Sequence, residues 1–379
     1  MAIVGMKQKI SQGDRPHIVL YGEVNSGKSS LFNLLLGQEA SVVSDIAGTT
    51  TDAVSKAVEL PGIGAVVLVD TPGVGDETLL GQRRMEATER ALRRADVILC
   101  LVPHGAKVDT RLEQEYPRAK VISIQSSRDN EEYNAPQRRA KVISMLAEVL
   151  SESKAEEHTI TGSLVKAGNL VILVMPQDSA APKGRLILPQ VQTIRELLDK
   201  QCQMLCLQPS EFLPALNKLS VLPDLVITDS QVFKQVEEMV PDGVPLTSFS
   251  VLMSAYKGSL PELLAGAKAL NNLAPDARVL IAEACSHAPT SEDIGRVKLP
   301  MMLRKKYGEG LVIDHVNGND FPADLTKYDL VIHCGACMFN RQHLLNRQDM
   351  AVAQSVPMTN YGIAIAAIQG ILSRIALPQ

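Results

Sequence analysis

The sequence predicts an α/β protein whose sheets are largely parallel, because short apolar runs alternate with helical segments along the whole chain. A glycine-rich turn follows the first apolar run, and cysteines follow two of the last ones. With 379 residues, of which 45% are hydrophobic, the chain is long enough to bury two or three separate cores. These observations together predict several α/β domains with ligand sites at strand ends.

Strands and helices are predicted in order from the apolar runs. In the first part, strands are expected at 17–22, 65–73, 96–102 and 119–125, with helices starting at Ser29 and covering 83–94. In the middle, strands are expected at 169–176, 202–208 and 224–230, with helices after 186–192 and from Ser210 and Gln231. In the last part, strands are expected at 278–284, 310–316, 329–333 and 356–362, before a closing helix over 363–377.

A polar stretch around residue 157 predicts the first domain boundary. We therefore expect three domains, at 1–157, 158–262 and 263–379. The second and third are predicted to be Rossmann-like, with helices on both faces of a sheet.

Composition narrows the function classes. The formal charge of -4 and an aromatic content of 3%, without tryptophan, argue against an electrostatic nucleic-acid binder. No apolar run approaches membrane-spanning length, and residues 1–17 lack the apolar stretch of a secretory signal. The sequence thus predicts a cytoplasmic protein that binds neither nucleic acid nor a membrane.

The segment after the first strand has the spacing of a phosphate-binding loop, Gly22-x4-Gly27-Lys28-Ser29. In such a loop the backbone N–H groups and the helix N-terminus face the phosphates. Lys28 is expected to reach the β- and γ-phosphate oxygens, and the Ser29 hydroxyl is expected to bind Mg²⁺. The first domain is therefore predicted to be a P-loop nucleotide-binding domain.

Two later segments supply the remaining parts of a nucleotide switch. Thr49, Thr50 and Thr51 lie where a switch segment would close on Mg²⁺ and the γ-phosphate. Asp70, in the sequence Asp-Thr-Pro-Gly, would hold the metal through water, and the N–H of Gly73 would meet the γ-phosphate. Since phosphoryl transfer is mostly positioning and charge neutralisation, this set predicts slow hydrolysis.

Three cysteines follow two predicted strands of the last part: Cys285, and the pair Cys334 and Cys337. Carboxyl ends of parallel strands meet at one edge of a sheet, so both halves are expected at one site. Three thiolates suit an iron–sulfur cluster with an open fourth position, or zinc. A structural zinc site would normally use four protein ligands, which leaves zinc as the alternative.

Three other residues are candidate oxygen or nitrogen ligands near these cysteines, namely His287, His333 and Glu292. Each histidine could complete the site or hydrogen-bond around it, and Glu292 could be a ligand or merely solvated. The other cysteines are expected to be core residues: Cys100 in a strand, and Cys202 with Cys206 on one face of a helix.

The first domain resembles the GTPases that include Era and the tRNA-modification GTPases. Combined with the Cys-x-His and His-Cys-x-x-Cys pattern at Cys285, His287, His333, Cys334 and Cys337, the chain resembles the FeFe-hydrogenase maturation GTPases of the HydF family. The resemblance covers essentially the whole chain, including the segments 181–199, 225–233, 245–258 and 294–300.

This resemblance implies a fold, cofactors and partners. It implies a homodimer built through the middle domain and a 4Fe-4S cluster on the three cysteines. The protein would then be a scaffold on which a diiron subcluster precursor is completed and handed to the apo FeFe hydrogenase, alongside the radical-SAM maturases. It also implies a K⁺ ion beside Asn25.

The guanine-reading element departs from the pattern of these GTPases. Instead of Asn-Lys-x-Asp the chain has Ser126, Ser127, Arg128 and Asp129, so only the aspartate remains. Asp129 is either the guanine reader or an ordinary loop residue.

Four residues are expected to act in hydrolysis: Lys28, Thr50, Asp70 and Gly73. The residues expected to bind GTP and Mg²⁺ are Gly22, Asn25, Ser26, Gly27, Lys28, Ser29, Ser30, Thr49, Thr50, Asp70, Gly73 and Asp129.

One rival function comes from another class. The cluster could take part in redox or tRNA-modification chemistry, with the GTPase domain gating that chemistry. The lack of a basic face and of a radical-initiating three-cysteine loop places this second.

Overall fold

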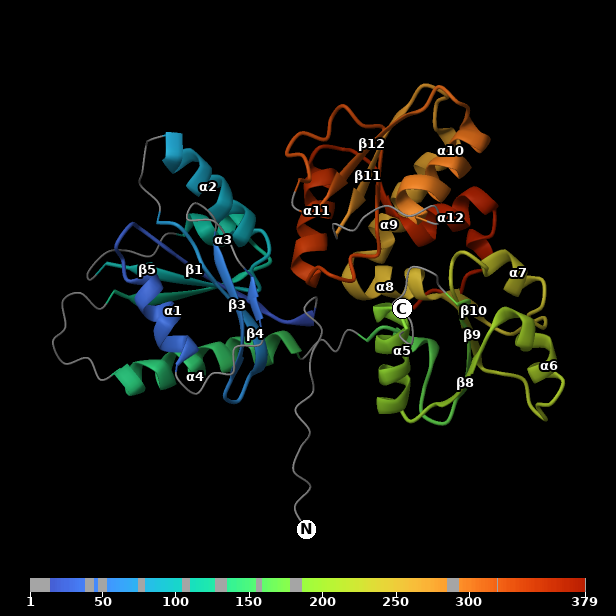
Figure 1. Cartoon of the computed structure of the whole chain (residues 1–379), viewed down its shortest axis with the longest axis horizontal. Helices are drawn as coiled ribbons and strands as arrows, with labels where there is room; N and C mark the ends of the chain where they lie inside the picture. Colours follow the sequence, from blue (N-terminus) through green and yellow to red (C-terminus); the bar gives the residue numbers. More distant parts are fainter. Residues whose placement is uncertain are drawn as a thin grey trace, which may run out of the picture. The chain divides into compact units, whose positions relative to one another are not determined.

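The structure of the chain is a computed structural model, drawn in Figure 1. The structure describes residues 14–37, 44–46, 53–73, 79–103, 110–126, 135–154, 159–177, 186–284, 293–318 and 320–378. The chain forms two compact units, residues 1–157 and 158–379.

The first unit is built on one six-stranded sheet with the order β2-β3-β4-β1-β5-β6. Its strands are β1 (His17–Gly22), β2 (Ser44–Ile46), β3 (Val54–Leu60), β4 (Gly64–Asp70), β5 (Val97–Val102) and β6 (Lys120–Gln125). Its helices are α1 (Lys28–Leu36), α2 (Leu79–Leu92), α3 (Arg111–Glu115) and α4 (Ala135–Lys154). Side chains of α1 and α4 pack on one face, and those of α2 and α3 on the other. The four strands β4, β1, β5 and β6 are parallel, as predicted.

The edge of this sheet differs from the prediction. The strands β2 and β3 are additional, and both pairings there, β2 with β3 and β3 with β4, are antiparallel. A tight turn joins β3 to β4, with Gly62 and Gly64 at positive φ of 76° and 97°. Glycine adopts such angles without steric cost, which explains the turn.

The second unit contains two four-stranded parallel sheets. The middle sheet has the order β10-β9-β7-β8. Its strands are β7 (Leu170–Val174), β8 (Gln203–Leu207), β9 (Leu225–Thr228) and β10 (Leu246–Ser248). Its helices are α5 (Leu188–Asp199), α6 (Phe212–Leu216), α7 (Phe233–Glu237), α8 (Phe249–Lys257) and α9 (Leu260–Ala267). Side chains of α5 and α8 pack on one face, and those of α6 and α7 on the other.

The strand expected over 202–208 is confirmed as β8, whereas the placement of Cys202 and Cys206 on one helix was wrong. Helix α5 ends at Asp199, Gln201 has a positive φ of 58°, and the chain then enters β8. Cys202 is buried before the strand, but Cys206 lies within β8 and is exposed. Only Cys100 and Cys202 are therefore core residues, as predicted for them.

The last sheet has the order β12-β11-β13-β14. Its strands are β11 (Arg278–Glu283), β12 (Val312–Asn317), β13 (Leu330–His333) and β14 (Met358–Asn360). Its helices are α10 (Leu299–Tyr307), α11 (Arg341–Ala353) and α12 (Tyr361–Gln369). Strands β11 and β13 are parallel neighbours, with Ala282 opposite His333. The two predicted cysteine-bearing strands thus end side by side at one edge.

The two sheets of the second unit are linked by helix α12. Helix α12 contributes to the cores of both, and the segment after it returns to the middle sheet. There Ile375 bridges to Leu246, and the Ala376 N–H donates to the Leu246 carbonyl at 2.7 Å. This exchange explains why residues 158–379 form one compact unit.

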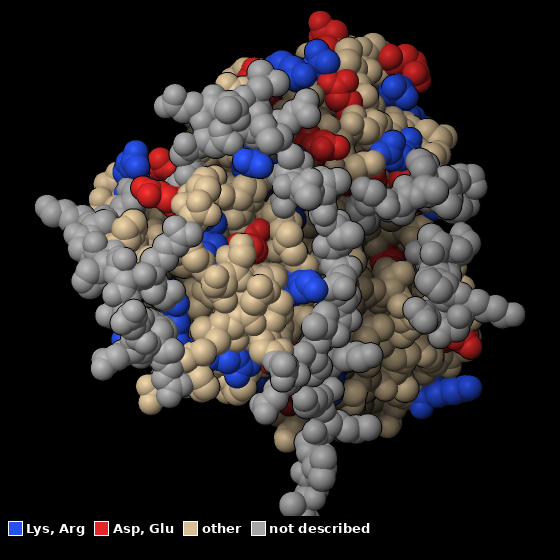
Figure 2. All heavy atoms as spheres, turned by 60° about the vertical axis from the view of Figure 1, so that its left-hand side comes forward, with Lys and Arg blue, Asp and Glu red and all other residues tan. Residues whose placement is uncertain are grey.

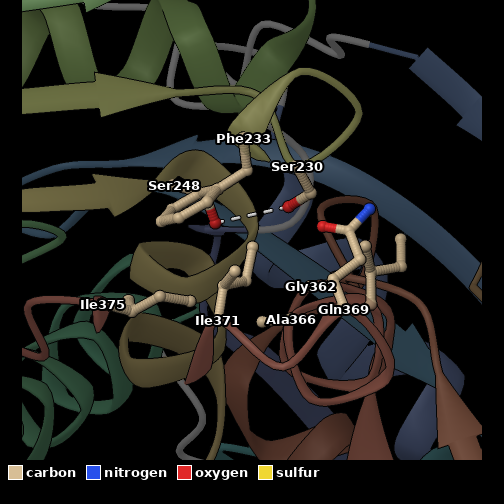
Figure 3. A pocket seen from close by; sticks show the side chains of 9 residues that line it. Ser230, Phe233, Ser248, Gly362, Ala366, Gln369, Ile371 and Ile375 are labelled. Carbon is tan, nitrogen blue, oxygen red and sulfur yellow. Dashed lines mark hydrogen bonds between the residues drawn. The ribbon is translucent and has the colours of Figure 1, made fainter. Parts of the chain in front are cut away.

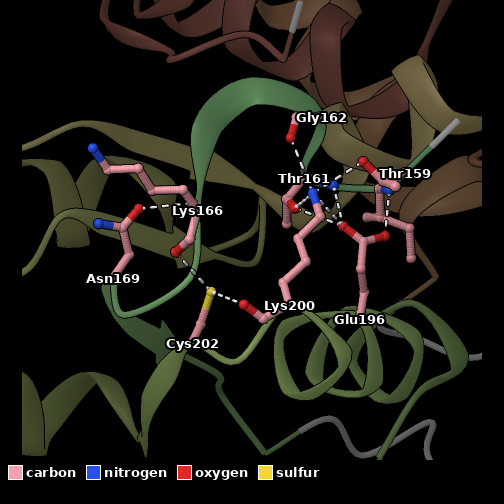
Figure 4. Close-up of polar contacts among 9 residues, drawn as sticks. Thr159, Thr161, Gly162, Lys166, Asn169, Glu196, Lys200 and Cys202 are labelled. Atoms are coloured by element: carbon pink, nitrogen blue, oxygen red, sulfur yellow. Dashed lines mark hydrogen bonds and ion pairs between the residues drawn. The ribbon is translucent and has the colours of Figure 1, made fainter. Parts of the chain in front are cut away.

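A polar network fixes the start of the second unit to α5 (Figure 4). Both carboxylate oxygens of Glu196 accept backbone N–H groups, from Ile160 and Thr161. Lys200 Nζ donates to the hydroxyls of Thr159 and Thr161 at 3.0 and 2.9 Å and lies 3.3 Å from Glu196. The entering chain thereby hydrogen-bonds to both members of the Glu196–Lys200 ion pair near the end of α5.

Within the described ranges, no helix combines the length and apolarity needed to cross a membrane. On the face drawn in Figure 2, acidic and basic side chains are interspersed with uncharged ones. The described atoms of that face form no continuous basic area.

Candidate functional site

The turn between β1 and α1 has the backbone of a phosphate-binding loop. Gly22 has a φ of 150°, and a Cβ there would lie 2.7 Å from the Leu101 carbonyl oxygen. Gly27, just before α1, has a φ of 94°. A side chain at position 22 would clash and one at 27 would be strained, so both glycines are needed by the turn. Asn25 is exposed in the loop at a positive φ of 64°.

Lys28 begins α1 and is buried in the loop. Its Nζ donates to the carbonyls of Gly22 and Glu23 at 3.0 and 2.7 Å. Burial lowers the pKa of Lys28, and the charge of Asp70 opposes this effect. The ammonium is therefore held over the loop by weak neutral acceptors that anionic phosphate oxygens could replace.

Asp70 ends β4 beside this lysine. Burial raises the pKa of Asp70, whereas the hydrogen bond from Ser29 and the charge of Lys28 lower it. Its Oδ1 is buried and has no hydrogen-bond partner among the described residues. A buried carboxylate oxygen of this kind fits a hard cation, and the neighbouring Ser29 hydroxyl completes an oxygen donor set suited to Mg²⁺.

Gly73 lies against the phosphate loop. A Cβ at this position would lie 2.4 Å from Val24 Cα and 2.6 Å from Val24 N. Only glycine fits such an approach, so the Asp-Thr-Pro-Gly segment and the loop form one surface. The other predicted nucleotide contacts, Thr49, Thr50 and Asp129, lie outside the described residues, as does Thr51.

One contact in this region was missed from the sequence. The Ser126 hydroxyl donates to the Ser26 carbonyl at 2.8 Å, which links the segment after β6 to the phosphate loop. Ser126 stands where the asparagine of a full guanine-reading element would be. The contact could have been suspected from the sequence, because Ser126 directly follows a predicted parallel strand and so lies at the same edge of the sheet as the phosphate loop.

The cysteine pair follows β13 directly. The Cys334 N–H donates to the Ala282 carbonyl at 2.8 Å, which extends the β11–β13 pairing by one residue. The Cys334 Sγ accepts the Ala284 N–H at 3.1 Å. Ala336, between the two cysteines, has a positive φ of 51°. The loop therefore turns back at the strand end with both thiols half-buried.

This donor set fits a thiolate-bound metal. Backbone N–H···S bonds stabilise thiolates, and a Cys-x-x-Cys turn is typical of iron–sulfur and zinc sites. The described ranges contain no cluster of three His, Cys, Asp or Glu side chains. Cys285 follows Ala284 in the sequence, but Cys285, His287 and Glu292 lie outside the described residues.

Both ring nitrogens of His333 already have protein partners. Nδ1 lies 2.8 Å from the Cys334 carbonyl oxygen, and Nε2 lies 2.8 Å from Arg347 Nη1. Burial and the charge of Arg347 lower the pKa of His333 to about 3, against the hydrogen bond to Cys334. In this arrangement His333 is a neutral partner of the cysteine loop, and it offers a metal no nitrogen.

A second buried polar group lies at the end of β11. Glu283 accepts from Arg296 Nε and from the Tyr361 hydroxyl, both at 3.3 Å. Burial raises the pKa of Tyr361, and the charge of Cys334 adds to this effect. Sequence reasoning did not predict these residues, because a strand-end glutamate and a helix-start tyrosine carry no motif.

A small hollow that has no room for a water molecule lies between the middle sheet and α12 (Figure 3). The serine hydroxyls at this hollow bind one another: the Ser230 hydroxyl hydrogen-bonds to the hydroxyls of Ser248 and Ser250 at 3.3 and 3.0 Å. The remaining lining is largely apolar. This hollow lacks the convergent polar groups of a ligand site.

Two family models cover the second unit. The hydrogen maturase F dimerization domain matches residues 160–258, and the hydrogen maturase F tetramerization domain matches residues 261–378. The chain belongs to the HydF family. The model of the 50S ribosome-binding GTPase matches residues 17–129, so this HydF-family chain is a GTPase. Together the three matches place a GTPase domain and the two hydrogen maturase F domains in one chain.

Curated relatives match the first unit of this HydF-family chain. The tRNA modification GTPase MnmE of Leptospira interrogans is 51% identical over 91 residues, 24% of this chain and 20% of that protein. MnmE of Laribacter hongkongensis is 41% identical over 113 residues, 28% of this chain and 25% of that protein. The chain therefore spans only a fifth to a quarter of these relatives.

Among solved structures, Aquifex aeolicus Era bound to GDP·AlF4⁻ is 17% identical with a TM-score of 0.24. The alignment covers 80% of this chain and 94% of that one.

Proposed function

We propose that this HydF-family GTPase is a scaffold and carrier in the cytoplasm, with a 4Fe-4S cluster held by Cys285, Cys334 and Cys337. On it the diiron subcluster of FeFe hydrogenase would be completed from a precursor and delivered to the apo-hydrogenase. The radical-SAM maturases would be the other partners. The observation that carries this proposal is the 3.1 Å bond from the Ala284 N–H to Cys334 Sγ. It brings the residue before Cys285 into contact with the other half of the motif.

The nucleotide site has a distinct part in the proposal. Lys28, with the N–H groups of the loop and of Gly73, would neutralise the phosphates of GTP. Ser29 and Asp70 would hold Mg²⁺, Ser29 directly and Asp70 through water, with Thr49 and Thr50 closing over them. K⁺ would bind beside Asn25, and Asp129 would read guanine. Slow hydrolysis of this kind suits a switch that controls delivery.

The test is activation of the hydrogenase. Protein purified from cells that contain the other maturation factors should confer activity on purified apo-hydrogenase. The same protein purified without those factors serves as the control and should confer none. A preparation that carries a full cluster and a diiron precursor but never activates apo-hydrogenase would contradict the carrier function.

Two other functions remain as alternatives. A tRNA-modification or redox GTPase is favoured only by the MnmE relatives, which match the first unit alone. A zinc-bearing regulatory GTPase would use the same cysteines. Iron, sulfide and zinc analysis of protein prepared without oxygen separates zinc from a cluster. A tRNA-binding measurement addresses the first alternative.

We propose that the dimer forms through α5 and β8. Val191 and Leu198 lie seven residues apart on α5, hence on one side of the helix, and are 47% and 57% exposed. The strand β8 is at the edge of its sheet and contains neither charged residues nor proline, so its edge is open to pairing with a second copy. The dimerization-domain match over residues 160–258 supports a second copy of this chain as the partner at this edge.

We expect Leu198→Asp to weaken the dimer. An unpaired carboxylate buried in an interface costs about 3 kcal/mol or more, which corresponds to a roughly hundredfold weaker dimer. Sedimentation velocity at micromolar concentration measures this. Val221→Asp is the control, because Val221 is 65% exposed but lies outside both elements. A Leu198→Asp protein as dimeric as the parent would rule out this surface.

A further inference from the structure

Arg347, on α11, occupies an unusual buried position behind the cysteine loop. It is 3% exposed, and its guanidinium carbon lies 4.6 and 4.7 Å from the ring centroids of Phe321 and Phe339. These two cation–π contacts help to hold the guanidinium in place. Its Nη2 donates to the Gly318 carbonyl and its Nη1 to His333 Nε2. Arg347 therefore presents one directed N–H to the histidine.

The direction of this hydrogen bond fixes the protons of His333. Arginine is a donor only, so His333 Nε2 must be the acceptor nitrogen of a neutral ring. The single ring proton then lies on Nδ1, which donates to the Cys334 carbonyl at 2.8 Å. A chain of two directed bonds thus runs from Arg347 through His333 to the peptide that follows Cys334.

We propose that Arg347 is a positioning residue for the metal-binding loop Cys334–Cys337. By fixing the tautomer of His333, Arg347 fixes the Cys334 carbonyl and hence the turn through Ala336 that presents both thiols. The inference rests on the proposed function only in taking this loop to be a metal site. It also removes His333 from the candidates for the fourth cluster ligand, leaving that position to another group.

The aromatic clamp extends this support. Phe339 stacks on His343 with 3.8 Å between ring centroids, and its carbonyl accepts from the buried Lys257 of α8 at 3.3 Å. Arg341 Nη1 donates to the Tyr256 carbonyl at 2.7 Å. The loop is thus held before Cys334 through His333 and after Cys337 by α8, so loss of Arg347 should remove the hydrogen bond to His333 and the contact with Phe339 but leave the bonds from α8 and Arg341 in place.

Co²⁺ is the probe, because its absorption reports thiolate ligation without requiring a cluster. In the full chain we expect Arg347→Met to weaken Co²⁺ binding by about 10 to 100-fold and to change the thiolate-to-cobalt bands, as loss of outer hydrogen bonds does elsewhere. Arg347→Lys keeps a cation between the rings and should recover part of the loss. GTP hydrolysis, which uses the first unit, should stay at the parental rate in both.

Arg278→Met is the matched control. Arg278 also packs on an aromatic ring, 5.7 Å from the centroid of Tyr328, and hydrogen-bonds to Asp314, but it begins β11 at the opposite end of the strand from the cysteines. Its replacement should lower the melting temperature and leave the cobalt spectrum unchanged. The same pattern for Arg347→Met would reduce Arg347 to a structural residue and overturn the inference.

A second measurement covers the case of an Arg347→Met protein that does not fold. Nitrogen-15 NMR of the parent chain, with the signal assigned by a His333→Gln variant, should show His333 protonated on Nδ1. A proton on Nε2 would overturn the inference directly. If the parent binds Co²⁺ through the cysteines but assembles no iron–sulfur cluster, the proposed function fails while the role of Arg347 stands.

Discussion

Replacing Lys28 by alanine is expected to abolish GTP hydrolysis and to leave metal binding at the cysteines unchanged. Lys28 Nζ lies within 3.0 Å of two loop carbonyls, where it can exchange these acceptors for phosphate oxygens. Loss of one preorganised charge donor costs on the order of a hundredfold or more in turnover. Phosphate release under single-turnover conditions measures the effect.

The control for this substitution is Lys120→Ala. Lys120 is exposed and begins β6, at the opposite end of that strand from the segment that contacts the phosphate loop. Its removal changes the net charge equally but should keep the parental rate. Parental hydrolysis by Lys28→Ala would refute the role of the lysine. A parallel loss of cluster iron would instead point to global misfolding.

The parallel sheets could be predicted because each buried strand reads as a short apolar run. The runs that became β1, β5, β7, β11 and β13 are almost fully buried and lie at the expected positions. The strand β3 was missed because its first three residues are exposed or half-buried and follow a polar segment, so it does not read as a continuous apolar run. The antiparallel pairing of β3 with β4 depends on the turn at Gly62 and Gly64, and the spacing of these glycines did not identify a hairpin.

Cys206 shows a different limit of sequence reasoning. Residues 193–206 contain apolar side chains at helical spacing, which predicted one helix carrying both Cys202 and Cys206. The structure ends the helix at Asp199, where Lys200 turns to the hydroxyls of Thr159 and Thr161. A contact with residues almost forty positions away decided the boundary, and local patterning carries no such information.

The candidate sites were predictable to the extent that backbone geometry defines them. The phosphate loop could be predicted because its turn requires glycines at positive φ. The position of Cys334 could be predicted because it comes directly after a buried parallel strand. The supporting side chains were not predictable. Arg347 and Glu283 act through contacts with other elements and belong to no local motif. Ser126 lies in the guanine-reading segment, but its bond to the phosphate loop joins residues 100 positions apart.

The cysteine substitutions should separate ligands from core residues. Cys285→Ala, Cys334→Ala and Cys337→Ala should each remove most cluster iron and sulfide, because thiolates are the ligands that hold the cluster. Each should then also fail to activate apo-hydrogenase. Cys100→Ala should keep the iron and lose only about 1 kcal/mol of stability, since it removes one small buried side chain. Chemical analysis after anaerobic reconstitution measures the metal.

Cys206→Ser is the sharpest control for these variants, because Cys206 is an exposed thiol that a reconstitution reagent can reach. It should retain the parental iron and sulfide content. Any iron that it loses would measure the iron held non-specifically by this exposed thiol.

Among the candidate fourth ligands, replacement of His287 or Glu292 should keep the iron but change the electron-spin signal if either binds the open position. Because both nitrogens of His333 are engaged, His333→Gln should act through the geometry of Cys334 instead. A Cys334→Ala protein with the parental iron and sulfide content would show that the cluster lies elsewhere.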